Sequence, residues 1–561
     1  MHQESHPQKL KGNQIGRLSW LIASSCALSF ALASGCNGTV NTVGNTGQNG
    51  GGNNGSTPPA NTAPGSLQDP FPPSWNSSGQ GLGDNRNQPN ETAINSANVG
   101  SLTVKWSFTT GASVSATPTV AGGDVYFPDW AGNLYALDAN TGKLIWQAQI
   151  SSYTGIPNDV SRTSPAVFNN ELIFGDDLSE SGPHNGARLL AVDRTSGNLI
   201  WMTQIDRHPA AIITGAAAVY NGIVYQGVSS AEEQYATDTK YPCCSFRGSM
   251  VAVNATTGQI LWKTYTVPDN GGATNRYSGN AIWQPPAIDP ARGALYVGTG
   301  NNYTVPASVE QCHEETPQAT DCTEADDHFD TTLAINLQTG AILWSQRLLG
   351  WDDWTVACAQ PGNPGACPTP PGPDFDLGGS GANLMGSVVG IGQKSGMYWL
   401  LNANDGTVLW GTQVGPGGDL GGIEWGTATD GTRIYVALTN NEHFDYKLAN
   451  GQTITGSAWC ALDPNNGKIL WQTPDPTQGT NFNFGSVSVA NGVMYAGSLD
   501  GHMYAFDATT GKILWNYQTG GSILGGPAIV NGVVYWGSGY ARSGGTANNE
   551  FYAFTLPAST K

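Results

Sequence analysis

The side chains able to do chemistry in this chain of 561 residues lie in a few polar stretches between apolar runs. Two carboxylates are adjacent at Glu232 and Glu233, two more at Asp352 and Asp353, and Asn301 lies between these pairs. A carboxylate can take up a proton, and carboxylate and amide oxygens are the ligands that hard cations prefer. Each residue also has a purely structural interpretation, as a solvated loop charge or a turn residue. Residue type alone therefore assigns no role.

The cysteines favour disulfides over haem attachment. The nine cysteines include no C-x-x-C-H motif, so we expect no covalently bound haem in this chain. In an exported protein, close spacing favours the pairs Cys312–Cys322 and Cys358–Cys367. The remaining cysteines of the C-terminal part are the adjacent Cys243 and Cys244, and Cys460 within an apolar run.

The elements that must position the polar residues are copies of one hairpin. In the copy MYAFDATTGKILW at 503–515, two apolar, β-prone runs flank a turn that ends in glycine. Asp507 can accept hydrogen bonds from amides ahead of it, and Gly511 can adopt the positive φ of a tight turn. Six related copies begin at Leu134, Leu189, Met250, Thr332, Tyr398 and Trp459.

The full repeat has four strands, A to D, because Asn531-Gly532 joins two further apolar runs ahead of the terminal copy. Four-stranded units repeating at about 40 residues or more indicate the blades of a β-propeller. The terminal copy Phe551–Leu556 lacks a Trp strand, and the strand around Trp106 has no partner before it, so their pairing would close a ring. We predict an all-β, eight-bladed propeller over 71–561, with one Trp per blade at 106, 146, 201, 262, 344, 410, 471 and 515.

The ends and the charge restrict location and partners. Basic residues, the apolar run Leu18–Ala33 and LASGC at Cys36 predict a signal peptide over 1–36 with a lipoprotein-type processing site, or else ordinary secretion. Residues 37–70, rich in Gly, Asn and Thr, read as a flexible tether. We thus expect a periplasmic or outer-membrane-anchored protein that meets membrane only through a lipid at Cys36. A net charge of −19 with 23 Lys and Arg argues against nucleic-acid binding.

The extra residues of the middle repeats fall in B–C and D–A connections, which lie on one face of a propeller because its strands alternate in direction. Ser229–Arg247, Asn301–Thr331 and Leu348–Gly378 are examples. Loops longer than about 15 residues are uncommon without a role, so we expect a binding site on this face. The alternative is that the loops merely cover the axis.

These loops resemble the pyrroloquinoline quinone (PQQ)-dependent quinoprotein alcohol dehydrogenases, and in particular their polyvinyl-alcohol dehydrogenase branch. The resemblance runs from Trp75 to the C-terminus and rests on GVSSAEEQ at Gly227, CCSFRGS at Cys243, NAIWQPPAIDP at Asn280, GTGNNY at Gly298, GWDDWTVAC at Gly350 and GQKSGMYWLL at Gly392. It implies an exported, PQQ- and Ca²⁺-dependent enzyme that oxidises a hydroxyl substrate such as polyvinyl alcohol or another secondary alcohol. Its electrons would pass to a separate acceptor such as a c-type cytochrome.

The resemblance also implies roles for individual residues. Glu232, Asn301 and Asp352 would bind Ca²⁺, and Asp352, preferred to Asp353 for its spacing to Trp354, would take the alcohol proton. Residues implied to contact PQQ are Trp283 as an aromatic floor, Lys394, Arg247, Trp425 and the adjacent pair Cys243 and Cys244. The cysteine pair resembles a vicinal disulfide that lies against the quinone in some relatives, although a bond to another loop is an alternative.

Two positions depart from the family pattern. Ser115 stands where a Glu is common in the first blade, so one quinone contact is in doubt. Glu424 precedes Trp425 where many members have Asn, and a carboxylate there would repel an anionic cofactor unless it is paired. The competing interpretation of the whole chain is a non-enzymatic propeller lipoprotein that resembles the outer-membrane assembly scaffold, which shares the Trp repeats but has short loops.

Overall fold

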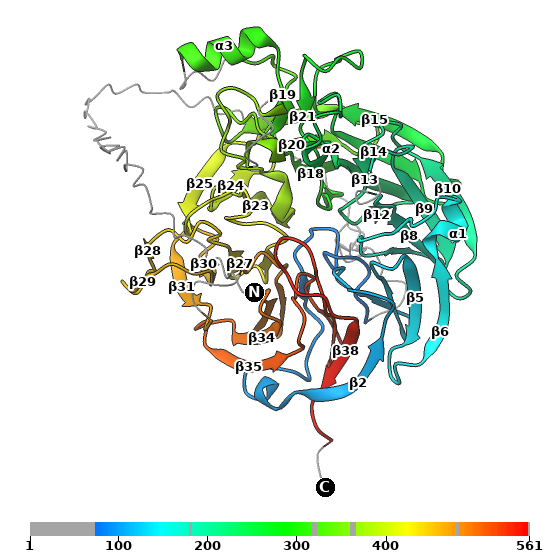
Figure 1. Ribbon diagram of the computed structural model, residues 1–561. Coiled ribbons are helices and arrows are strands. Elements are labelled where there is room, and N and C mark those ends of the chain that lie inside the picture. The colour runs from blue at the N-terminus through cyan, green and yellow to red at the C-terminus, as the bar shows by residue number, and fades with distance from the viewer. Residues whose placement is uncertain (1–72, 179–181, 317–321, 360–365, 478–481, 559–561) are drawn as a thin grey trace, which may run out of the picture. The chain divides into compact units, whose positions relative to one another are not determined.

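Eight four-stranded antiparallel sheets surround a common axis (Figure 1). The structure is a computed structural model that describes residues 73–178, 182–316, 322–359, 366–477 and 482–558. These residues belong to one unit of the chain, Ala63–Lys561. The eight-bladed propeller predicted from the repeats is confirmed. The predicted signal segment 1–36 and tether 37–70 lie outside the described residues.

The first four blades follow the chain. Blade 1 contains β3 (Thr119–Ala121), β4 (Asp124–Pro128), β5 (Asn133–Asp138) and β6 (Leu144–Gln149). Blade 2 contains β7 (Ala166–Phe168), β8 (Glu171–Gly175), β9 (Arg188–Asp193) and β10 (Leu199–Gln204). Blade 3 contains β12 (Ala218–Tyr220), β13 (Ile223–Ser230), β14 (Ser249–Asn254) and β15 (Ile260–Tyr265). Blade 4 contains β17 (Ala287–Asp289), β18 (Ala294–Gly298), β20 (Thr331–Asn336) and β21 (Ile342–Arg347).

The other blades complete the ring. Blade 5 contains β22 (Ala382–Met385), β23 (Val388–Gly392), β24 (Met397–Asn402) and β25 (Val408–Gln413). Blade 6 contains β26 (Ala428–Thr429), β27 (Ile434–Leu438), β30 (Ala458–Leu462) and β31 (Ile469–Pro474). Blade 7 contains β32 (Ser488–Ala490), β33 (Val493–Gly497), β34 (His502–Asp507) and β35 (Ile513–Gln518). Blade 8 contains β36 (Ala528–Val530), β37 (Val533–Gly537), β38 (Glu550–Thr555) and β2 (Thr103–Thr109).

Short elements decorate this ring. The strands are β1 (Asn87–Gln88), β11 (Ala211–Ile212), β16 (Ser278–Gly279), β19 (Asn302–Thr304), β28 (Tyr446–Lys447) and β29 (Thr453–Ile454). The helices are α1 (Ile150–Thr154), α2 (Glu232–Tyr235), α3 (Ala307–Glu315), and the 3-10 turns η1 (Val99–Ser101), η3 (Val356–Cys358) and η5 (Gly378–Ser380). Among the described residues, no helix is long and apolar enough to cross a membrane.

The ring closes as predicted, by pairing of the two ends of the propeller. Strand β2 runs antiparallel to β38, with Phe108 opposite Phe551, and the two lie side by side in Figure 1. The Trp515 indole of blade 7 donates a hydrogen bond to the Leu102 carbonyl, 3.1 Å away, just before β2. Closure covers the outer edge of β38, which would otherwise be unpaired, and gives β2 its partner.

The repeated Trp and Gly residues join each blade to the next. Each outer-strand Trp donates its indole N–H to a backbone carbonyl of the following blade, as Trp201 does to Ala255 at 2.7 Å. The turn glycine of that blade lies under the ring: a Cβ on Gly258, whose φ is +72°, would be 2.7 Å from Trp201. The glycine is therefore required by both the turn and the interblade contact.

The cysteines pair as the spacing predicted. Disulfides join Cys312 to Cys322 and Cys358 to Cys367, both in long loops, and Cys460 is a buried free thiol. Cys243 and Cys244 are bonded to each other, which resolves the alternatives left open by the sequence.

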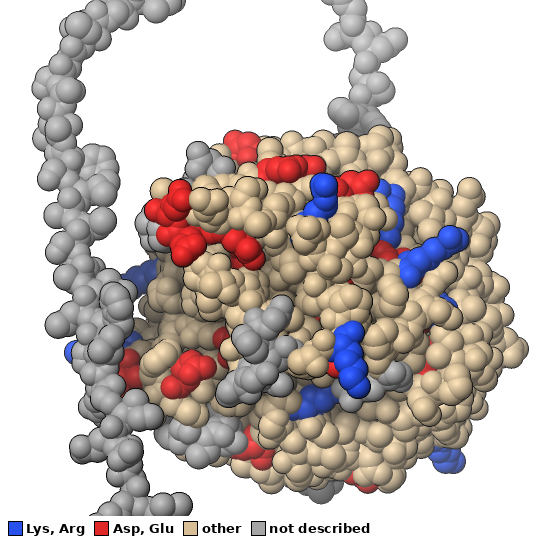
Figure 2. Space-filling view, turned by 45° about the horizontal axis from the view of Figure 1, so that its top comes forward, with Lys and Arg blue, Asp and Glu red and all other residues tan. Residues whose placement is uncertain are grey.

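On the face drawn in Figure 2, the described Lys and Arg side chains are scattered among uncharged residues and form no continuous track.

Candidate cofactor site

A cavity of about 270 Å³ lies on the face of the B–C and D–A connections. Its lining comes from the ends of strands and the connections of blades 2 to 8. The indole rings of Trp283 and Trp425 meet edge to face there, with centroids 5.0 Å apart. The structure thus brings together four residues that the resemblance assigned to cofactor or metal: Trp283, Asn301, Lys394 and Trp425.

Lys394 is the buried cation of this cavity, with 6% of its surface exposed. Its Nζ lies 2.7 Å from Asp374 Oδ2 and 3.4 Å from Asp376 Oδ2. Burial alone would lower the pKa of Lys394, but the two carboxylates outweigh it and raise that pKa well above its ordinary value. Lys394 is therefore a fixed positive charge at neutral pH.

Oxygen donors stand next to Lys394. Asp376 lines the cavity, and its Oδ1 accepts the Asn301 backbone N–H at 2.7 Å. The Asn301 side-chain amide donates to the carbonyls of Asn302 and Trp354, at 3.0 and 2.8 Å, which leaves its Oδ1 as the free acceptor. Glu233 also lines the cavity, and its enclosed Oε1 has no hydrogen-bond partner among the described residues.

Carboxyl groups outnumber the cations here. Burial, followed by the nearby Asp376, raises the pKa of Glu233 to about 8. Burial also raises the pKa of Asp374 well above its ordinary value, although Lys394 opposes this shift. One lysine cannot balance so many buried carboxyl groups, so this part of the cavity has capacity for a further positive charge. In the described part of the chain, however, no group of three or more His, Cys, Asp or Glu side chains is already arranged as a metal site.

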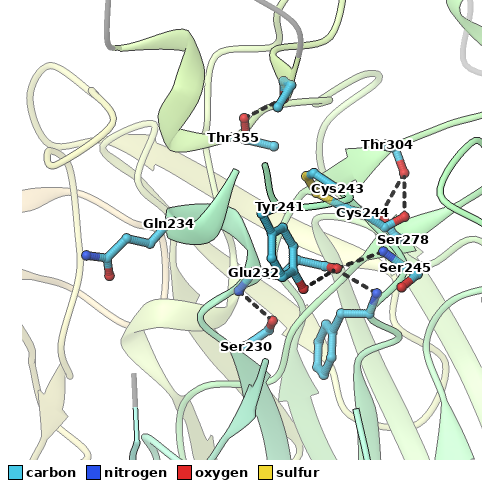
Figure 3. Close-up of a disulfide and its surroundings, with 12 residues drawn as sticks. Ser230, Glu232, Gln234, Tyr241, Cys243, Cys244, Ser245, Ser278, Thr304 and Thr355 are labelled. Carbon is cyan, nitrogen blue, oxygen red and sulfur yellow. Dashed lines mark hydrogen bonds between the residues drawn. A yellow bond between two sulfur atoms is a disulfide. The ribbon is translucent and has the colours of Figure 1, made fainter. Parts of the chain in front are cut away.

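Glu232 differs from the sequence-based prediction. It is fully buried, and its carboxylate faces the 241–246 loop instead of the cavity (Figure 3). Its Oε1 accepts hydrogen bonds from Tyr241 Oη at 3.0 Å and the Ser245 amide at 2.9 Å, and its Oε2 accepts from the Phe246 amide at 2.7 Å. With both oxygens used, Glu232 holds the loop that carries the vicinal disulfide. The neighbouring Glu233 lines the cavity, where the resemblance had placed Glu232.

Asp352 also lies behind the cavity wall. It is fully buried, and its two oxygens accept the backbone amides of Asp374, at 2.9 Å, and Phe375, at 2.5 Å. Burial raises its pKa to about 7. Gly372 passes so close that a Cβ there would be 2.4 Å from Asp352 Oδ1. Asp352 thus holds the turn that presents Asp374 and Asp376 to Lys394, and Asp376 is the aspartate that reaches the cavity.

Three further residues assigned by resemblance do not line the cavity: Arg247, Cys243 and Cys244. The Arg247 guanidinium lies 3.9 Å from the centre of the Tyr265 ring, donates to the Val267 carbonyl and pairs with Asp269. The disulfide packs in the apolar cluster that includes Cys367 and Trp283, near but not on the lining. The disulfide therefore supports the wall beside Trp283, whereas Arg247 lies apart from the cavity.

Sequence reasoning missed two arginines that do line the cavity, Arg162 and Arg542. The Arg162 guanidinium lies 4.4 Å from the centre of the Trp425 ring and 5.5 Å from that of Trp130. The Arg542 guanidinium lies 3.7 Å from the centre of the Trp130 ring, which therefore contacts both arginines. No motif marks either arginine. The aspartates beside Lys394 were also missed, although the Asp-Phe-Asp sequence at 374–376 could have indicated a pair of carboxylates.

The two departures from the family pattern have local explanations. Ser115 Oγ accepts a hydrogen bond from the Trp130 indole N–H at 2.9 Å, so Ser115 fixes the ring on which Arg162 and Arg542 pack. Glu424 lines the cavity with 5% exposure, and burial raises its pKa to about 8 although Lys394 opposes the shift. A largely protonated Glu424 at neutral pH would not repel an anion as a carboxylate would.

Comparison with known proteins gives two kinds of match. A family profile described as outer membrane protein assembly factor BamB matches residues 105–346 and 396–538, which are the Trp repeats. The gap between those ranges contains the Asp352, Asp376 and Lys394 segment of the cavity. The solved quinohemoprotein alcohol dehydrogenase of Comamonas testosteroni superposes with a TM-score of 0.66 at 19% identity, covering 88% of this chain and 82% of that one, and shows the shared fold.

Two relatives match beyond the repeats. A polyvinylalcohol dehydrogenase of a Pseudomonas species is 32% identical over 509 residues, which are 84% of this chain and 74% of the relative. A protein of the same name from Sphingopyxis sp. strain 113P3 is 32% identical over 525 residues, covering 84% of this chain and 75% of its own. The chain therefore belongs to the quinoprotein alcohol dehydrogenase family, together with the polyvinyl-alcohol dehydrogenases.

Proposed function

We propose that the protein is a PQQ- and Ca²⁺-dependent alcohol dehydrogenase that oxidises a hydroxyl substrate and passes the electrons to a separate acceptor. The observation that carries the proposal is the cavity itself. It combines an aromatic wall, Trp283 and Trp425, with oxygen ligands around the buried Lys394. Homologues with the names of alcohol dehydrogenases support the reaction class.

The lining suits an aromatic quinone that carries carboxylates. Trp283 offers an indole face or edge to a flat ring system, and such contacts are favourable beyond the area they bury. Lys394 can donate to a quinone oxygen, and Arg162 and Arg542 can form charge-assisted hydrogen bonds with carboxylates. We assign to Arg162 the anchoring role that the resemblance implied for Arg247.

The lining also suits a hard cation. Glu233, Asn301 and Asp376 present two carboxylates and an amide oxygen, which are ligands that Ca²⁺ takes. The unpaired Glu233 Oε1 and the raised pKa of Glu233 both have a natural explanation in an absent positive charge. We propose these three residues as the protein ligands, with Glu233 in place of Glu232.

When bound, PQQ supplies the two-electron acceptor for the alcohol, and Ca²⁺ supplies a Lewis acid beside it. Asp376 takes the hydroxyl proton, because it is the aspartate of this segment that lines the cavity and because Lys394 and the Asn301 amide fix its orientation. Asp352, implied as the base by the resemblance, instead positions this turn through the amides of Asp374 and Phe375.

The proposed substrate is a secondary alcohol, with a hydroxyl-bearing polymer as the extended case. A groove formed by residues of α2 and the following loop, among them Tyr235, Lys240 and Tyr241, shares Gln234 with the cavity. Further units of a chain could lie in this groove while one hydroxyl occupies the cavity. A Tyr235→Ala variant should raise KM for polyvinyl alcohol and leave KM for a small secondary alcohol unchanged.

Location and electron transfer complete the proposal. We propose export through the signal segment 1–36, with a lipid anchor at Cys36 that holds the protein in the periplasm or at the outer membrane. We also propose a separate electron acceptor, such as a c-type cytochrome, as the family resemblance implies.

The competing proposal is a scaffold without enzymatic activity. The match of the assembly-factor profile to the Trp repeats favours it. Against it stands the 347–395 segment between the matched ranges, which supplies the buried Lys394 and its aspartates. A scaffold has no need of a buried ammonium group held among carboxylates in a cavity.

Steady-state activity tests the proposal. The protein without cofactor is mixed with PQQ and Ca²⁺, and the alcohol-dependent reduction of an artificial electron-accepting dye is followed with small secondary alcohols and with polyvinyl alcohol. Activity that requires both additions supports the proposal. Absence of alcohol-dependent reduction over this set, with PQQ bound, would leave a quinone-binding protein without this activity, and absence of PQQ binding would favour the scaffold.

A further inference from the structure

A second, smaller chamber of about 40 Å³ adjoins the cofactor cavity. Arg162, Thr214 and Trp425 line both spaces and form the wall between them. The other polar side chains of the chamber are Ser78, Arg86, Ser115, Thr117, Ser164, Gln284 and Ser486. The lining contains two guanidinium groups and several hydroxyls but no carboxylate. Such a lining suits an anion.

Arg86 is the central group of this chamber, and only 2% of it is exposed. Its backbone adopts a left-handed conformation, with φ of +47°, and Gly426 leaves room for its side chain: a Cβ there would be 2.5 Å from Arg86 Nε. The guanidinium Nη1 donates to the Ser78 carbonyl at 3.2 Å and to Thr117 Oγ1 at 3.5 Å. Both are neutral acceptors.

The positive charge of Arg86 is not balanced by a contact. Arg86 Nε has no hydrogen-bond partner and no carboxylate lies within 4.0 Å of the guanidinium in the described part of the chain. Its nearest counter-charge is Asp84, but burial raises the pKa of Asp84 to about 7 even though Arg86 opposes this, so Asp84 is only partly ionised at neutral pH. A buried guanidinium without a counterion is costly.

Arg162 adds a second positive charge to the lining of the chamber. It contacts the Trp425 and Trp130 rings, and it forms no ion pair with a carboxylate among the described residues. Ser78, with 6% exposure, contributes a hydroxyl whose Oγ also has no hydrogen-bond partner in the described structure. The unpaired Arg86 Nε and Ser78 Oγ and the Arg162 guanidinium thus share one small chamber.

We propose that this chamber binds one small monatomic anion, chloride in a cellular setting, between Arg86 and Arg162. The volume of about 40 Å³ is small beside the 270 Å³ of the cofactor cavity, so the chamber suits a monatomic anion better than a larger organic one. The anion neutralises Arg86 and holds Arg162 against Trp425. The chamber shares Arg162 with the proposed quinone site, but halide binding is measured on the protein without PQQ and does not require alcohol dehydrogenase activity.

Crystallography with bromide as the probe tests this proposal directly. Crystals of the protein grown in sodium bromide should show an anomalous peak at the bromine edge, in the chamber, within hydrogen-bonding distance of both guanidinium groups. A chamber that holds only water, without anomalous signal at any bromide concentration the crystals tolerate, overturns the proposal.

A solution experiment supplies the second readout. The melting temperature should rise and saturate with sodium chloride or bromide, relative to sodium gluconate at equal ionic strength. Arg86→Met should weaken the apparent halide affinity at least tenfold, whereas the exposed Arg207→Met should leave it unchanged. Should Arg86→Met fail to fold, the milder Ser78→Ala is expected to weaken it several-fold. Equal responses to halide and gluconate in the native protein would refute the site.

Discussion

The adjacent residues Glu232 and Glu233 offer a sharp test, because the same isosteric change should affect them in opposite ways. The sequence pattern assigned the metal to Glu232, but its oxygens accept three hydrogen bonds within the protein, from Tyr241, Ser245 and Phe246. Glu233 instead lines the cavity with an unpaired Oε1. Glu232→Gln should therefore damage stability, and Glu233→Gln should damage ligand binding.

The magnitudes follow from the contacts. In Glu232→Gln, an amide NH₂ replaces one acceptor oxygen and faces an N–H or O–H donor, so at least one buried donor loses its partner. The expected loss is about 1–3 kcal/mol of unfolding free energy. In Glu233→Gln the unpaired Oε1 loses no hydrogen bond, and the raised pKa already leaves Glu233 largely protonated at neutral pH, so the protein without metal should be about equally stable. Its affinity for Ca²⁺ should fall by about 10–100-fold or more, the loss typical even of an outer-shell partner.

Two measurements on the same preparations separate these effects. Guanidinium chloride unfolding without metal gives the stability of each variant, and titration calorimetry with Ca²⁺ in the presence of PQQ gives the affinity. The native protein and a surface variant, Gln259→Glu, serve as controls. The reasoning is refuted if Glu232→Gln loses Ca²⁺ binding at native stability while Glu233→Gln binds normally.

Three further predictions concern the base, the pH dependence and the blade contacts. Asp376→Asn should lower kcat by roughly 10²–10⁴-fold with PQQ still bound, because it removes the proton acceptor that faces the cavity. Asp352→Asn should chiefly lower thermal stability. The reverse pattern in steady-state kinetics would restore Asp352 as the base. Calcium affinity, measured by calorimetry, should rise with pH to about 8 and then level off. The reason is that Glu233 is protonated below its raised pKa, and ligation needs its carboxylate. A flat affinity profile from pH 6 to 9 would contradict this. Gly258→Ala should cost about 1–3 kcal/mol more unfolding free energy than Gly222→Ala, since both have positive φ but only Gly258 lies against a Trp ring; equal losses in denaturant unfolding would count against the contact.

The fold was predictable because its signals are local and repeated. Each hairpin carries its own turn residues, as Asp507 and Gly511 show, and the unpaired strand at Trp106 could be matched to the incomplete copy at the C-terminus. The repeat pattern did not reveal that the turn glycine also packs against a Trp ring. Its contact with the Trp of the preceding blade depends on how neighbouring sheets stack, which no single repeat encodes.

The site was predictable only to within a residue or a loop. The motifs located segments that line one cavity, where Trp283, Asn301 and Lys394 come together. Which of two adjacent carboxylates faces inward depends on the backbone of α2 and on competing amides, so Glu232 and Glu233 could not be told apart from their order. Arg162 came without any motif, because its position relies on contacts with Trp residues from other blades.

Binding of the cofactor itself is the most direct test of the central claim, that this cavity holds PQQ beside Ca²⁺. The protein is incubated with a small excess of PQQ, with Ca²⁺ or with a chelator, and bound quinone is quantified by absorption after gel filtration. We expect one PQQ per chain with Ca²⁺, little with the chelator, and loss of binding in Lys394→Met but not in Arg247→Met, whose side chain does not line the cavity. Quinone that elutes free of the native protein at all Ca²⁺ concentrations would contradict the account.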